Sequence, residues 1–543
     1  MENLVNIFLA LQAPVAMLFV SRQLMHYFQL ESYQFQGYFR TLWRQKKKVI
    51  VPLLLLTAVH IAAYLVSTYF IYQTHDIRTE NPEIKRILYA GISFLLVAAM
   101  GFLLRRQAKS APAKKPFVVT SRVKRLYAVH LIVVVGIGLL IGFAQMNLLL
   151  LLLYFFYPLL LPLVVALSAV LALPIEKMIF RMYFKDAEKK LLQNKWLIRI
   201  GITGSYGKTS TKFVLNTILS QKYNVLCTPA SFNTPMGVTR IVRERLQPSH
   251  QVFIGEMGAR HVGEIKELCN LVHPEIGILT AVGPQHLDTF RTIERIEKTK
   301  YELIEALPED SYAVFLNDDG IVTRLYEKTE KPKCLVGREG SEVWAEDVQV
   351  SATGSSFMLC FKDGEKIPCE TRLLGEHNIL NILTAAAVAK YLKLTGDQIA
   401  RGIAALQPVE HRLQLLKSAG GVTVIDDAFN TNPRSAKKAL DVLKAFPGRR
   451  IIVTPGMVEL GAEEEKYNEE FGSYMADCVD IAVLVGKKHT APIVKGLQEK
   501  GFKAENIHVV SSLDEAIRLN QTMLRSGDVV MYENDLPDHY SEG

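Results

Sequence analysis

The chain has few cysteines, and their positions fit neither a metal site nor a disulfide framework. There are six in 543 residues, and no CxxC pair or zinc-type spacing occurs among them. This pattern excludes a cysteine-rich zinc site and indicates reduced thiols in a cytosolic compartment. The six are Cys227, Cys269, Cys334, Cys360, Cys369 and Cys478.

Acidic residues are absent from segment 105–125, although it is rich in lysine and arginine. Segment 21–48 is similar, with Glu31 as its one acid, whereas segment 74–86 carries acidic and basic residues in equal number. The net charge of +9 could indicate a nucleic-acid-binding protein. The basic residues, however, lie beside long apolar runs, so membrane topology explains the charge and no nucleic-acid partner is expected.

Long apolar runs fill the first third of the chain, whose overall hydrophobic content is 49%. Most of them reach the roughly 20 residues that a helix needs to cross a bilayer. The first could instead be a signal peptide, but MENLVN has no positive charge and no cleavage site is obvious. We therefore predict a retained anchor and a membrane region at residues 1–173. Its five spans are expected at about 4–20, 49–73, 87–104, 126–144 and 147–173.

Positively charged loops stay on the cytoplasmic side of a membrane. Segments 21–48 and 105–125 would then lie inside, with the N-terminus outside a bacterial-type cell membrane and the part after the fifth span in the cytoplasm. An amphipathic pattern over 174–196 predicts a linker helix. The aromatic and basic residues of 21–48 fit a helix in contact with membrane lipids, or a loop packed on the cytosolic part. His60 and His130, inside spans, are expected to be packed and hydrogen-bonded, with a functional role as the alternative.

The stretch GITGSYGKTS, residues 201–210, looks like a phosphate-binding loop whose spacing is off by one. The common pattern G-x-x-x-x-G-K-[ST] requires a glycine at position 202, where this chain has Ile202. The apolar run WLIRIGITG precedes the loop and TKFVLNTILSQ follows it, so a strand, a glycine loop and a helix are expected. Backbone N–H groups of such a loop bind phosphate, Lys208 would reach the β- and γ-phosphates, and Thr209 would bind Mg²⁺. The alternative is a tight turn that binds nothing.

Two further polar residues follow expected strands. VFIGEMG places Glu256 at the end of one strand, and IGILTAVGPQHLD places His286 just after another. Ligand sites of α/β proteins lie at the carboxyl ends of parallel strands. Together with the glycine loop, the two residues suggest a metal–phosphate site.

The loop and the motifs after it resemble the Mur ligase family of amide-forming enzymes, whose ATP loop is written G-x-x-G-x-x-G-K-T. FNTPMG, GEMGARHVGEIKEL, HLDTFRTIERIEKTK, LNDDG, GEHNILNILTAAAVA and EHRLQ follow in family order. VIDDAFNTNPRSAKKAL and GMVELG are most like the branch that adds D-alanyl-D-alanine. The resemblance covers about 197–530.

The resemblance implies a multi-domain fold. An α-helical transmembrane region with its linker would be followed by an α/β P-loop ATPase-type central domain at 197–408 and a Rossmann-like α/β C-terminal domain at 409–543. It also implies the chemistry. ATP, with Mg²⁺, phosphorylates a substrate carboxylate, and an amine then attacks the acyl phosphate and releases phosphate.

Roles carry over from the family residue by residue. Thr209 and Glu256 would hold one Mg²⁺, and His286 would help to hold a second. The family often has a carbamoylated lysine near the second ion. Lys300, fourteen residues after His286, is the preferred candidate, Lys298 is the other, and a plain surface lysine is the alternative.

The C-terminal domain also contributes in this family. Arg412 would reach the phosphates, Asp427 would hold the ribose, and Phe429 stands where some members have a lysine. The predicted catalytic residues are Lys208, His286 and Lys300. The predicted ATP-binding residues are Gly204, Ser205, Tyr206, Gly207, Lys208, Thr209, Ser210, Asn317, Asn378, Asn381, Arg412 and Asp427, with the three asparagines on the adenine side. The predicted substrate-side residues are Asn233, Thr234, Asn430, Asn432 and Ser435.

Two features depart from the family. The domain that binds the uridine nucleotide of the sugar-peptide substrate has no counterpart, because the membrane region takes its place. The tail ENDLPDHY is acidic and aromatic where the family closes with a basic motif, so it could line the active site or cap the domain.

Three functions are compatible with these observations. The first is a membrane-anchored ligase that adds an amino acid or dipeptide to a carboxylate-bearing cell-wall precursor, including one linked to a lipid. The second is a polymer synthase of the poly-γ-glutamate or capsule type. The third is a non-enzymatic scaffold with a relic ATP domain, which the retained site residues argue against. In either enzyme, the C-terminal domain is expected to rotate and close on ATP, since Arg412 and Asp427 must reach the loop.

Overall fold

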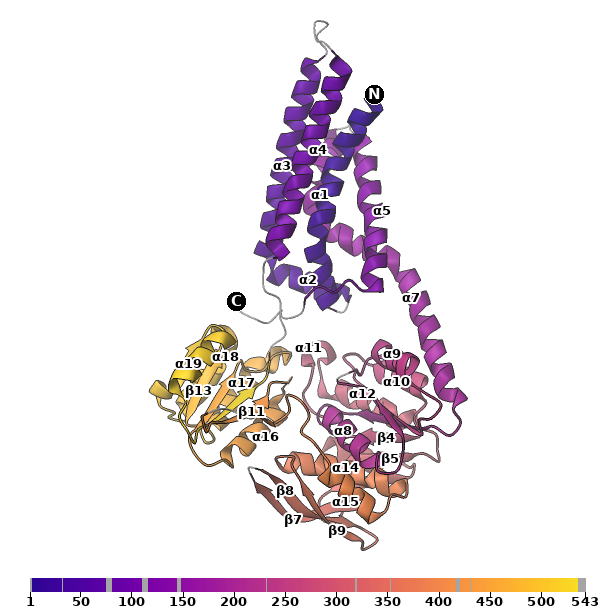
Figure 1. The fold of residues 1–543 in the computed structure, drawn as a ribbon, viewed down its shortest axis with the longest axis vertical. Helices are drawn as coiled ribbons and strands as arrows, with labels where there is room; N and C mark the ends of the chain where they lie inside the picture. The colour runs from indigo at the N-terminus through magenta and orange to yellow at the C-terminus, as the bar shows by residue number, and fades with distance from the viewer. Residues whose placement is uncertain are drawn as a thin grey trace. The chain divides into compact units, whose positions relative to one another are not determined.

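The computed structural model describes residues 2–31, 33–74, 81–109, 116–143, 148–230, 232–317, 320–351, 353–416, 420–429 and 431–535. They form two compact units, Met1–Phe180 and Arg181–Gly543 (Figure 1). The predicted substrate-side residue Asn430 lies outside the described residues, as do Asp318 and Asp319 of the LNDDG motif.

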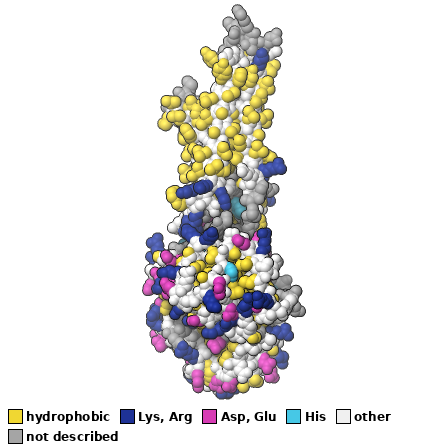
Figure 2. All heavy atoms as spheres, turned by 90° about the vertical axis from the view of Figure 1, so that its left-hand side faces the viewer, with side chains coloured by type: hydrophobic (Ala, Val, Ile, Leu, Met, Phe, Trp, Pro, Cys, Tyr) yellow, Lys and Arg dark blue, Asp and Glu magenta, His cyan; other side chains and the backbone are white. Residues whose placement is uncertain are grey.

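The first unit is a helical bundle. Five of its helices are long and apolar enough to cross a membrane. Many large apolar side chains on these helices are exposed, as Figure 2 shows, which is unusual for a protein surface that faces water. The first four predicted spans lie on α1, α3, α4 and α5. The elements are α1 (Glu2–Leu30), α2 (Phe35–Arg44), α3 (Lys46–Gln73), α4 (Pro82–Lys109), α5 (Ser121–Phe143), α6 (Leu148–Phe155), the 3₁₀ turn η1 (Tyr157–Leu160) and α7 (Leu161–Gln193).

The helices found here have other boundaries than the predicted fifth span and linker. The span predicted at 147–173 is broken after α6. Pro158 lies in the first turn of η1 and Pro162 in the first turn of α7, where the missing N–H of proline costs no helical hydrogen bond. The linker predicted at 174–196 is no separate helix, because α7 continues through Pro174 as far as Gln193.

The two histidines inside the bundle are packed, and each is hydrogen-bonded through at least one ring nitrogen, as the sequence favoured. His130 is fully buried, with Ser21 Oγ 2.7 Å from Nε2 and Ser168 Oγ 2.9 Å from Nδ1. His60 is fully buried with Nε2 3.3 Å from the Tyr154 carbonyl oxygen. These contacts join α5 to α1 and α7, and α3 to α6.

Much of segment 21–48 is helical. It includes the end of α1, the amphipathic helix α2 and the first residues of α3. Tyr38 of α2 is buried and donates a hydrogen bond to the Pro162 carbonyl oxygen at 3.1 Å. Trp43, by contrast, is 75% exposed, with the Lys46 ammonium 5.0 Å from its ring centroid. An exposed aromatic face next to cations is typical of a helix at a membrane interface.

The central domain of the second unit is built on a nine-stranded sheet with the order β2-β3-β1-β4-β5-β6-β7-β8-β9. It is parallel from β2 to β7 and ends in the antiparallel strands β8 and β9. The strands are β1 (Ile198–Thr203), β2 (Val225–Cys227), β3 (Val252–Glu256), β4 (Ile276–Leu279), β5 (Tyr312–Leu316), β6 (Lys333–Gly337), β7 (Val343–Ser351), β8 (Gly354–Phe361) and β9 (Lys366–Thr371).

Helices cover both faces of this sheet, each over its own apolar core. Helices α8, α14 and α15 pack on one face, and α9, α10, α12 and α13 pack on the other together with the end of α7. Ala187 and Leu191 of α7 are fully buried there. The helices are α8 (Lys208–Leu219), α9 (Pro235–Arg245), α10 (Glu264–Val272), α11 (Leu287–Phe290), α12 (Ile293–Glu305), α13 (Ile321–Lys328), α14 (Glu376–Tyr391) and α15 (Gly396–Ala404).

The C-terminal domain carries a six-stranded sheet with the order β10-β11-β15-β12-β13-β14, parallel except for β10. Both domains are therefore α/β as predicted, with mixed rather than purely parallel sheets. The strands are β10 (Gln414–Leu416), β11 (Thr423–Asp427), β12 (Arg450–Thr454), β13 (Ile481–Val485), β14 (Ile507–Val510) and β15 (Val529–Glu533). The helical elements are α16 (Pro433–Lys444), η2 (Gly461–Glu463), α17 (Glu464–Met475), α18 (Lys487–Glu499), η3 (Ala504–Asn506) and α19 (Leu513–Met523).

Candidate functional site

The glycine loop joins β1 to α8, which confirms the predicted order of strand, loop and helix. Gly204 has φ 148°, and a Cβ there would lie 2.1 Å from Thr280 Oγ1, so no other residue fits. Gly207, with φ 80°, is the N-cap of α8, and Thr209 and Ser210 lie in the first turn of that helix. Backbone N–H groups at such a helix start are available to bind phosphate.

Side chains of the loop fix its shape. Ser205 Oγ donates to the Gly283 carbonyl oxygen at 3.0 Å, and Tyr206 donates to the Pro284 carbonyl oxygen at 2.7 Å. Lys208 Nζ donates to the carbonyl oxygens of Gly204, at 2.6 Å, and Ser205. Burial lowers the pKa of Lys208 to about 8, which Glu256 counteracts in part.

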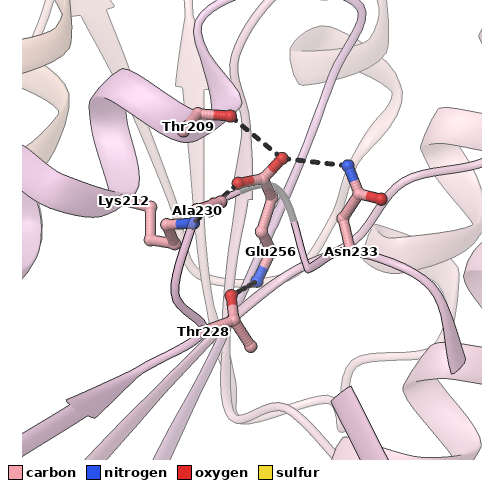
Figure 3. Close-up of polar contacts among 6 residues, drawn as sticks. All are labelled: Thr209, Lys212, Thr228, Ala230, Asn233 and Glu256. Carbon is pink, nitrogen blue, oxygen red and sulfur yellow. Dashed lines mark hydrogen bonds and ion pairs between the residues drawn. The ribbon is translucent and has the colours of Figure 1, made fainter. Parts of the chain in front are cut away.

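Glu256 is the best-partnered side chain of the site (Figure 3). It ends β3, in register with Ile202 of β1. Its Oε1 accepts hydrogen bonds from Thr209 Oγ1 and Asn233 Nδ2, both at 3.1 Å, and its Oε2 lies 2.9 Å from Lys212 Nζ. Burial opposes the charge of Glu256, yet its pKa is lowered, because Lys212 and Lys208 outweigh that effect. The carboxylate therefore stays ionised beside the phosphate loop.

Lys212 was not among the predicted site residues. It is fully buried, and its ammonium also donates to the Ala230 carbonyl oxygen. It thus connects α8, β3 and the loop that leads to Asn233. The signal was present in the sequence, because Lys212 follows Lys208 by one helical turn in GKTSTK and so lies on the same face.

The His286 side chain contacts the C-terminal domain. It follows β4 with φ 51°, and its Nδ1 lies 2.7 Å from Glu459 Oε2. Glu459 Oε1 lies 3.4 Å from a guanidinium nitrogen of Arg260. Burial lowers the pKa of His286, while Glu459 raises it. Glu459, from the GMVELG motif, was not a predicted site residue, because no local pattern reveals a contact between two domains.

Lys300 lies on α12 and is buried, whereas the alternative candidate Lys298 is exposed. No hydrogen bond or ion pair joins its Nζ to another of the residues that the structure describes. Burial, helped by repulsion from Lys208, lowers the pKa of Lys300 well below its ordinary value. A neutral amine is the form that reacts with carbon dioxide, so this environment suits the predicted carbamoylation.

Donor chemistry decides whether the predicted metal ligands suit Mg²⁺. Thr209 and Glu256 offer oxygen atoms, which Mg²⁺ prefers, and a carbamate on Lys300 would add another, with His286 as a nitrogen donor. Among the described residues, no group of three or more His, Cys, Asp or Glu side chains has metal-binding geometry. Mg²⁺ usually needs only one or two protein carboxylates, with phosphates and waters completing its shell, so the residues present fit the ion.

The adenine-side asparagines lie in two places. Asn378 and Asn381 are buried in the first two turns of α14, where Asn381 Oδ1 accepts a hydrogen bond from Thr211 of α8 at 3.1 Å. Asn317 follows β5 and accepts a hydrogen bond from Thr323 at 3.0 Å. The first pair therefore adjoins the helix of the phosphate loop.

The C-terminal domain adds Arg412 and Asp427. The Arg412 guanidinium lies 4.4 Å from the centroid of the Phe429 ring, and its Nε is buried without a partner among the described residues. Its charge acts on both Lys208 and Glu256 of the central domain. Burial raises the pKa of Asp427 to about 7, although Arg412 and the Leu413 N–H, at 3.0 Å, both favour its ionised form.

Three of the predicted substrate-side residues cap helices. Thr234 is the N-cap of α9 and accepts from the Gly237 N–H at 3.2 Å. Asn432 and Ser435 form a reciprocal capping box at the start of α16, with both hydrogen bonds at 3.0 Å. These side chains are thus used by the fold, and their substrate role stays a prediction.

Glu533 is a further buried acid that the sequence did not single out as a site residue. It ends β15 in register with Asp427, and its Oε2 accepts from Thr454 Oγ1. Burial raises the pKa of Glu533 to about 8. The carboxyl edge of the C-terminal sheet therefore carries two acids whose charged forms are disfavoured.

Comparisons with known proteins agree with this geometry. The Mur ligase middle domain matches residues 202–389, and the Mur ligase glutamate ligase domain matches residues 411–532. The UDP-N-acetylmuramoyl-tripeptide–D-alanyl-D-alanine ligase of Mycobacterium tuberculosis (strain H37Rv) is 33% identical over 357 residues, which cover 61% of this chain and 69% of that protein.

Solved structures of Mur ligases are also similar to this chain. MurF from Acinetobacter baumannii superimposes with a TM-score of 0.61 at 26% identity, covering 67% of this chain and 79% of that one. The MurF ligase of Thermotoga maritima in complex with ADP gives a TM-score of 0.60 at 26% identity, covering 67% and 82%. The chain belongs to the Mur ligase family of ATP-dependent peptide ligases.

Proposed function

We propose that this protein is a membrane-anchored ligase that adds an amino acid or a dipeptide to a carboxylate-bearing cell-wall peptide precursor. ATP provides the energy and an acyl phosphate is the intermediate. The observation that carries the proposal is the convergence of two half-sites. The central domain supplies Lys208, the Thr209–Glu256 pair and the buried Lys300, and the C-terminal domain supplies Arg412, whose charge acts on Lys208 and Glu256.

Phosphoryl transfer depends on positioning and charge neutralisation more than on covalent help from the protein. The loop amides and Lys208 would bind the β- and γ-phosphates, and Arg412 would approach them from the other domain. Thr209, Glu256 and His286 would hold Mg²⁺, which neutralises charge on the transferred phosphoryl group when bound. The acceptor carboxylate then displaces ADP at the γ-phosphorus.

Lys300 would supply an anion once carbamoylated. Its neutral amine attacks the carbon of CO₂, one N–C bond forms, and the amine loses a proton to solvent. The product is a carbamate, which replaces a cation by an oxygen ligand. Burial of Lys300 and the depressed pKa of its amine support this step.

In the second half-reaction, the amine attacks the carbonyl carbon of the acyl phosphate and phosphate leaves with the C–O bonding electrons. The related enzymes are named for a UDP-N-acetylmuramoyl-tripeptide and D-alanyl-D-alanine. We propose that dipeptide, or a single amino acid, as the amine here. The acceptor is proposed to be lipid-linked, which the apolar helices of the first unit support.

We also propose a location in a bacterial-type cell membrane, with the N-terminus outside and the catalytic domains in the cytoplasm. The acid-free basic segment 105–125 and the balanced segment 74–86 support it. The first 226 residues contain no cysteine, so single cysteines can report topology. A membrane-impermeant maleimide should label Asn81→Cys in intact cells and leave Ser121→Cys unlabelled. The opposite pattern would indicate the opposite orientation in the membrane.

Mass spectrometry of products tests the activity itself. Purified full-length protein would be incubated with ATP, with a lipid-linked or UDP-linked peptide precursor, and with D-alanyl-D-alanine or single amino acids. The expected product is the lipid-linked precursor plus one residue or dipeptide, together with ADP. A ladder of masses would indicate a polymer synthase, and no mass increase with any acceptor would contradict the proposal.

A further inference from the structure

Glu459 connects the C-terminal domain to the predicted metal site of the central domain, in a contact that the steps above do not use. Its Oε2 lies 2.7 Å from His286 Nδ1, and its Oε1 lies 3.4 Å from Arg260. The His286 and Glu459 side chains are 14% and 11% exposed, whereas that of Arg260 is 56% exposed. Because exposed ion pairs contribute little, the contact with His286 is the one that matters.

The chemistry of this contact determines which nitrogen of His286 is free. An ionised carboxylate can only accept a hydrogen bond, so Nδ1 of His286 carries the proton that points at Glu459. The lone pair of the neutral imidazole is then on Nε2. Histidines that bind metals are commonly oriented by a carboxylate in this way, and the carboxylate also makes the ring a better ligand.

We propose that Glu459 is a positioning residue that fixes the tautomer and ring orientation of His286, so that Nε2 is presented to a divalent cation. Glu459 belongs to the C-terminal domain and His286 to the central domain. The second metal position is therefore complete only when the two domains are in contact. The proposal rests on the proposed ligand role of His286.

The backbone on both sides of the contact supports a specific role. His286 has φ 51° and Glu459 has φ 65°, so both partners lie in the left-handed region, which non-glycine residues seldom adopt. Such conformations persist only where surrounding contacts impose them, and they concentrate at functional sites. Two of them meet here in one hydrogen bond.

The loop that carries Glu459 is braced from within its own domain. Met457 N–H donates to Asn468 Oδ1, and Asn468 Nδ2 donates to the Met457 carbonyl oxygen, both at 2.9 Å. Met457, Leu460 and Asn468 are buried. A carboxylate on a rigid loop can orient a ring more accurately than one on a mobile surface chain.

Pulsed EPR with Mn²⁺ tests the proposal on the full-length protein in detergent with ADP. Imidazole coordination gives a ¹⁴N coupling on Mn²⁺, which wild type should show and His286→Ala should lack. Glu459→Ala should weaken Mn²⁺ binding about 10- to 100-fold and reduce the coupling, as expected for loss of a partner that orients a ligand. Glu459→Gln should keep most of both, because its amide oxygen still accepts from Nδ1.

The fold offers a matched control. Glu464 lies 3.3 Å from His489 Nδ1, and this pair is contained in the C-terminal domain. Glu464→Ala should leave the ¹⁴N coupling unchanged. Metal-free ADP affinity should be the same in all variants, and ¹⁵N NMR of the metal-free protein should show the His286 tautomer altered in Glu459→Ala alone.

An unchanged coupling and Mn²⁺ affinity in Glu459→Ala would overturn the proposal, as would a wild type without ¹⁴N coupling. These outcomes are independent of the ligase assay. A wild type that shows Glu459-dependent coupling yet forms no product would refute the proposed activity and leave the role of Glu459 intact.

Discussion

The two halves of the site differ in how completely the protein satisfies their polar groups. In the central domain, Glu256 has Thr209, Asn233 and Lys212 around it and stays ionised. In the C-terminal domain, Arg412 has a buried Nε without a partner among the described residues, and the pKa of Asp427 is raised to about 7. Unpaired buried polar groups are costly and are rare outside functional sites. The part of the central half around the phosphate loop is therefore preformed, whereas the C-terminal half is matched to a ligand.

The largest expected effect comes from removing the phosphate-binding cation of the preformed half. Lys208→Ala should lower the rate of ATP-dependent phosphate release about 1,000-fold, because a preorganised charge at the transferred group is lost. The exposed Lys195→Ala, with the same change in charge, should retain wild-type activity. Equal activity of Lys208→Ala and wild type would mean that the phosphate loop is not the ATP site.

Removing Lys212 tests whether the central half depends on its internal ion pair. Lys212→Met removes the ion-pair partner of the buried Glu256 carboxylate, which should cost about 3–5 kcal/mol of stability. Urea unfolding followed by far-ultraviolet circular dichroism would measure this loss of stability. Lys212→Met/Glu256→Met should recover most of the loss. Lys495→Met, which breaks an exposed pair with Glu469, should cost less than about 1 kcal/mol, and an equal loss in both single variants would refute the distinction.

Lys300 tests the predicted carbamate. Lys300→Ala should lower the rate about 100-fold, within the range for loss of one charge-stabilising group. Added formate or acetate should restore part of the activity by supplying the missing carboxylate oxygen. Lys298→Ala, at an exposed position, should behave as wild type. Full activity of Lys300→Ala, or a severe loss of activity in Lys298→Ala, would show that Lys300 is not the carbamoylated residue.

A pH-dependent effect is expected from Asp427 in the C-terminal half. Its pKa is about 7 in the folded protein, against about 3.9 when unfolded. Between these values Asp427 releases its proton in the unfolded chain and keeps it in the folded protein. The contribution of Asp427 to stability therefore falls as pH rises from about 4 to 7 and then levels off. Asp427→Asn should flatten this part of the profile of unfolding free energy against pH. An unchanged slope would show that Asp427 is ionised and already paired by the protein.

Local patterns in the sequence were sufficient for the preformed half. The strand, the glycine loop and the helix follow from periodicity and from the spacing of GITGSYGKTS. The resemblance to the family, through its spacing from His286, selected Lys300, which is the buried one of the two candidate lysines. These features depend on residues a few positions apart or on motifs, so a sequence reveals them.

Three features of the structure were not predicted from the sequence, each for a different physical reason. The His286–Glu459 contact joins residues from two domains, and no periodicity encodes it. Asn432 and Ser435 carry a local helix-start signal, Asn-Pro-Arg-Ser, whose capping role was not predicted beside the substrate role. The fifth span was placed by hydropathy alone, which does not register that Pro158 and Pro162 end one helix and start another.

The unbroken helix α7 has a practical consequence for anyone who wishes to crystallise the ligase part alone. Its last turns belong to the interior of that part, where Ala187 and Leu191 are fully buried and Asp186 pairs with Arg243 at 2.6 Å. A fragment trimmed to the start of the family match at residue 202 would lose these turns together with most of β1. A fragment that begins near Arg181 would keep them, and is the one expected to remain soluble.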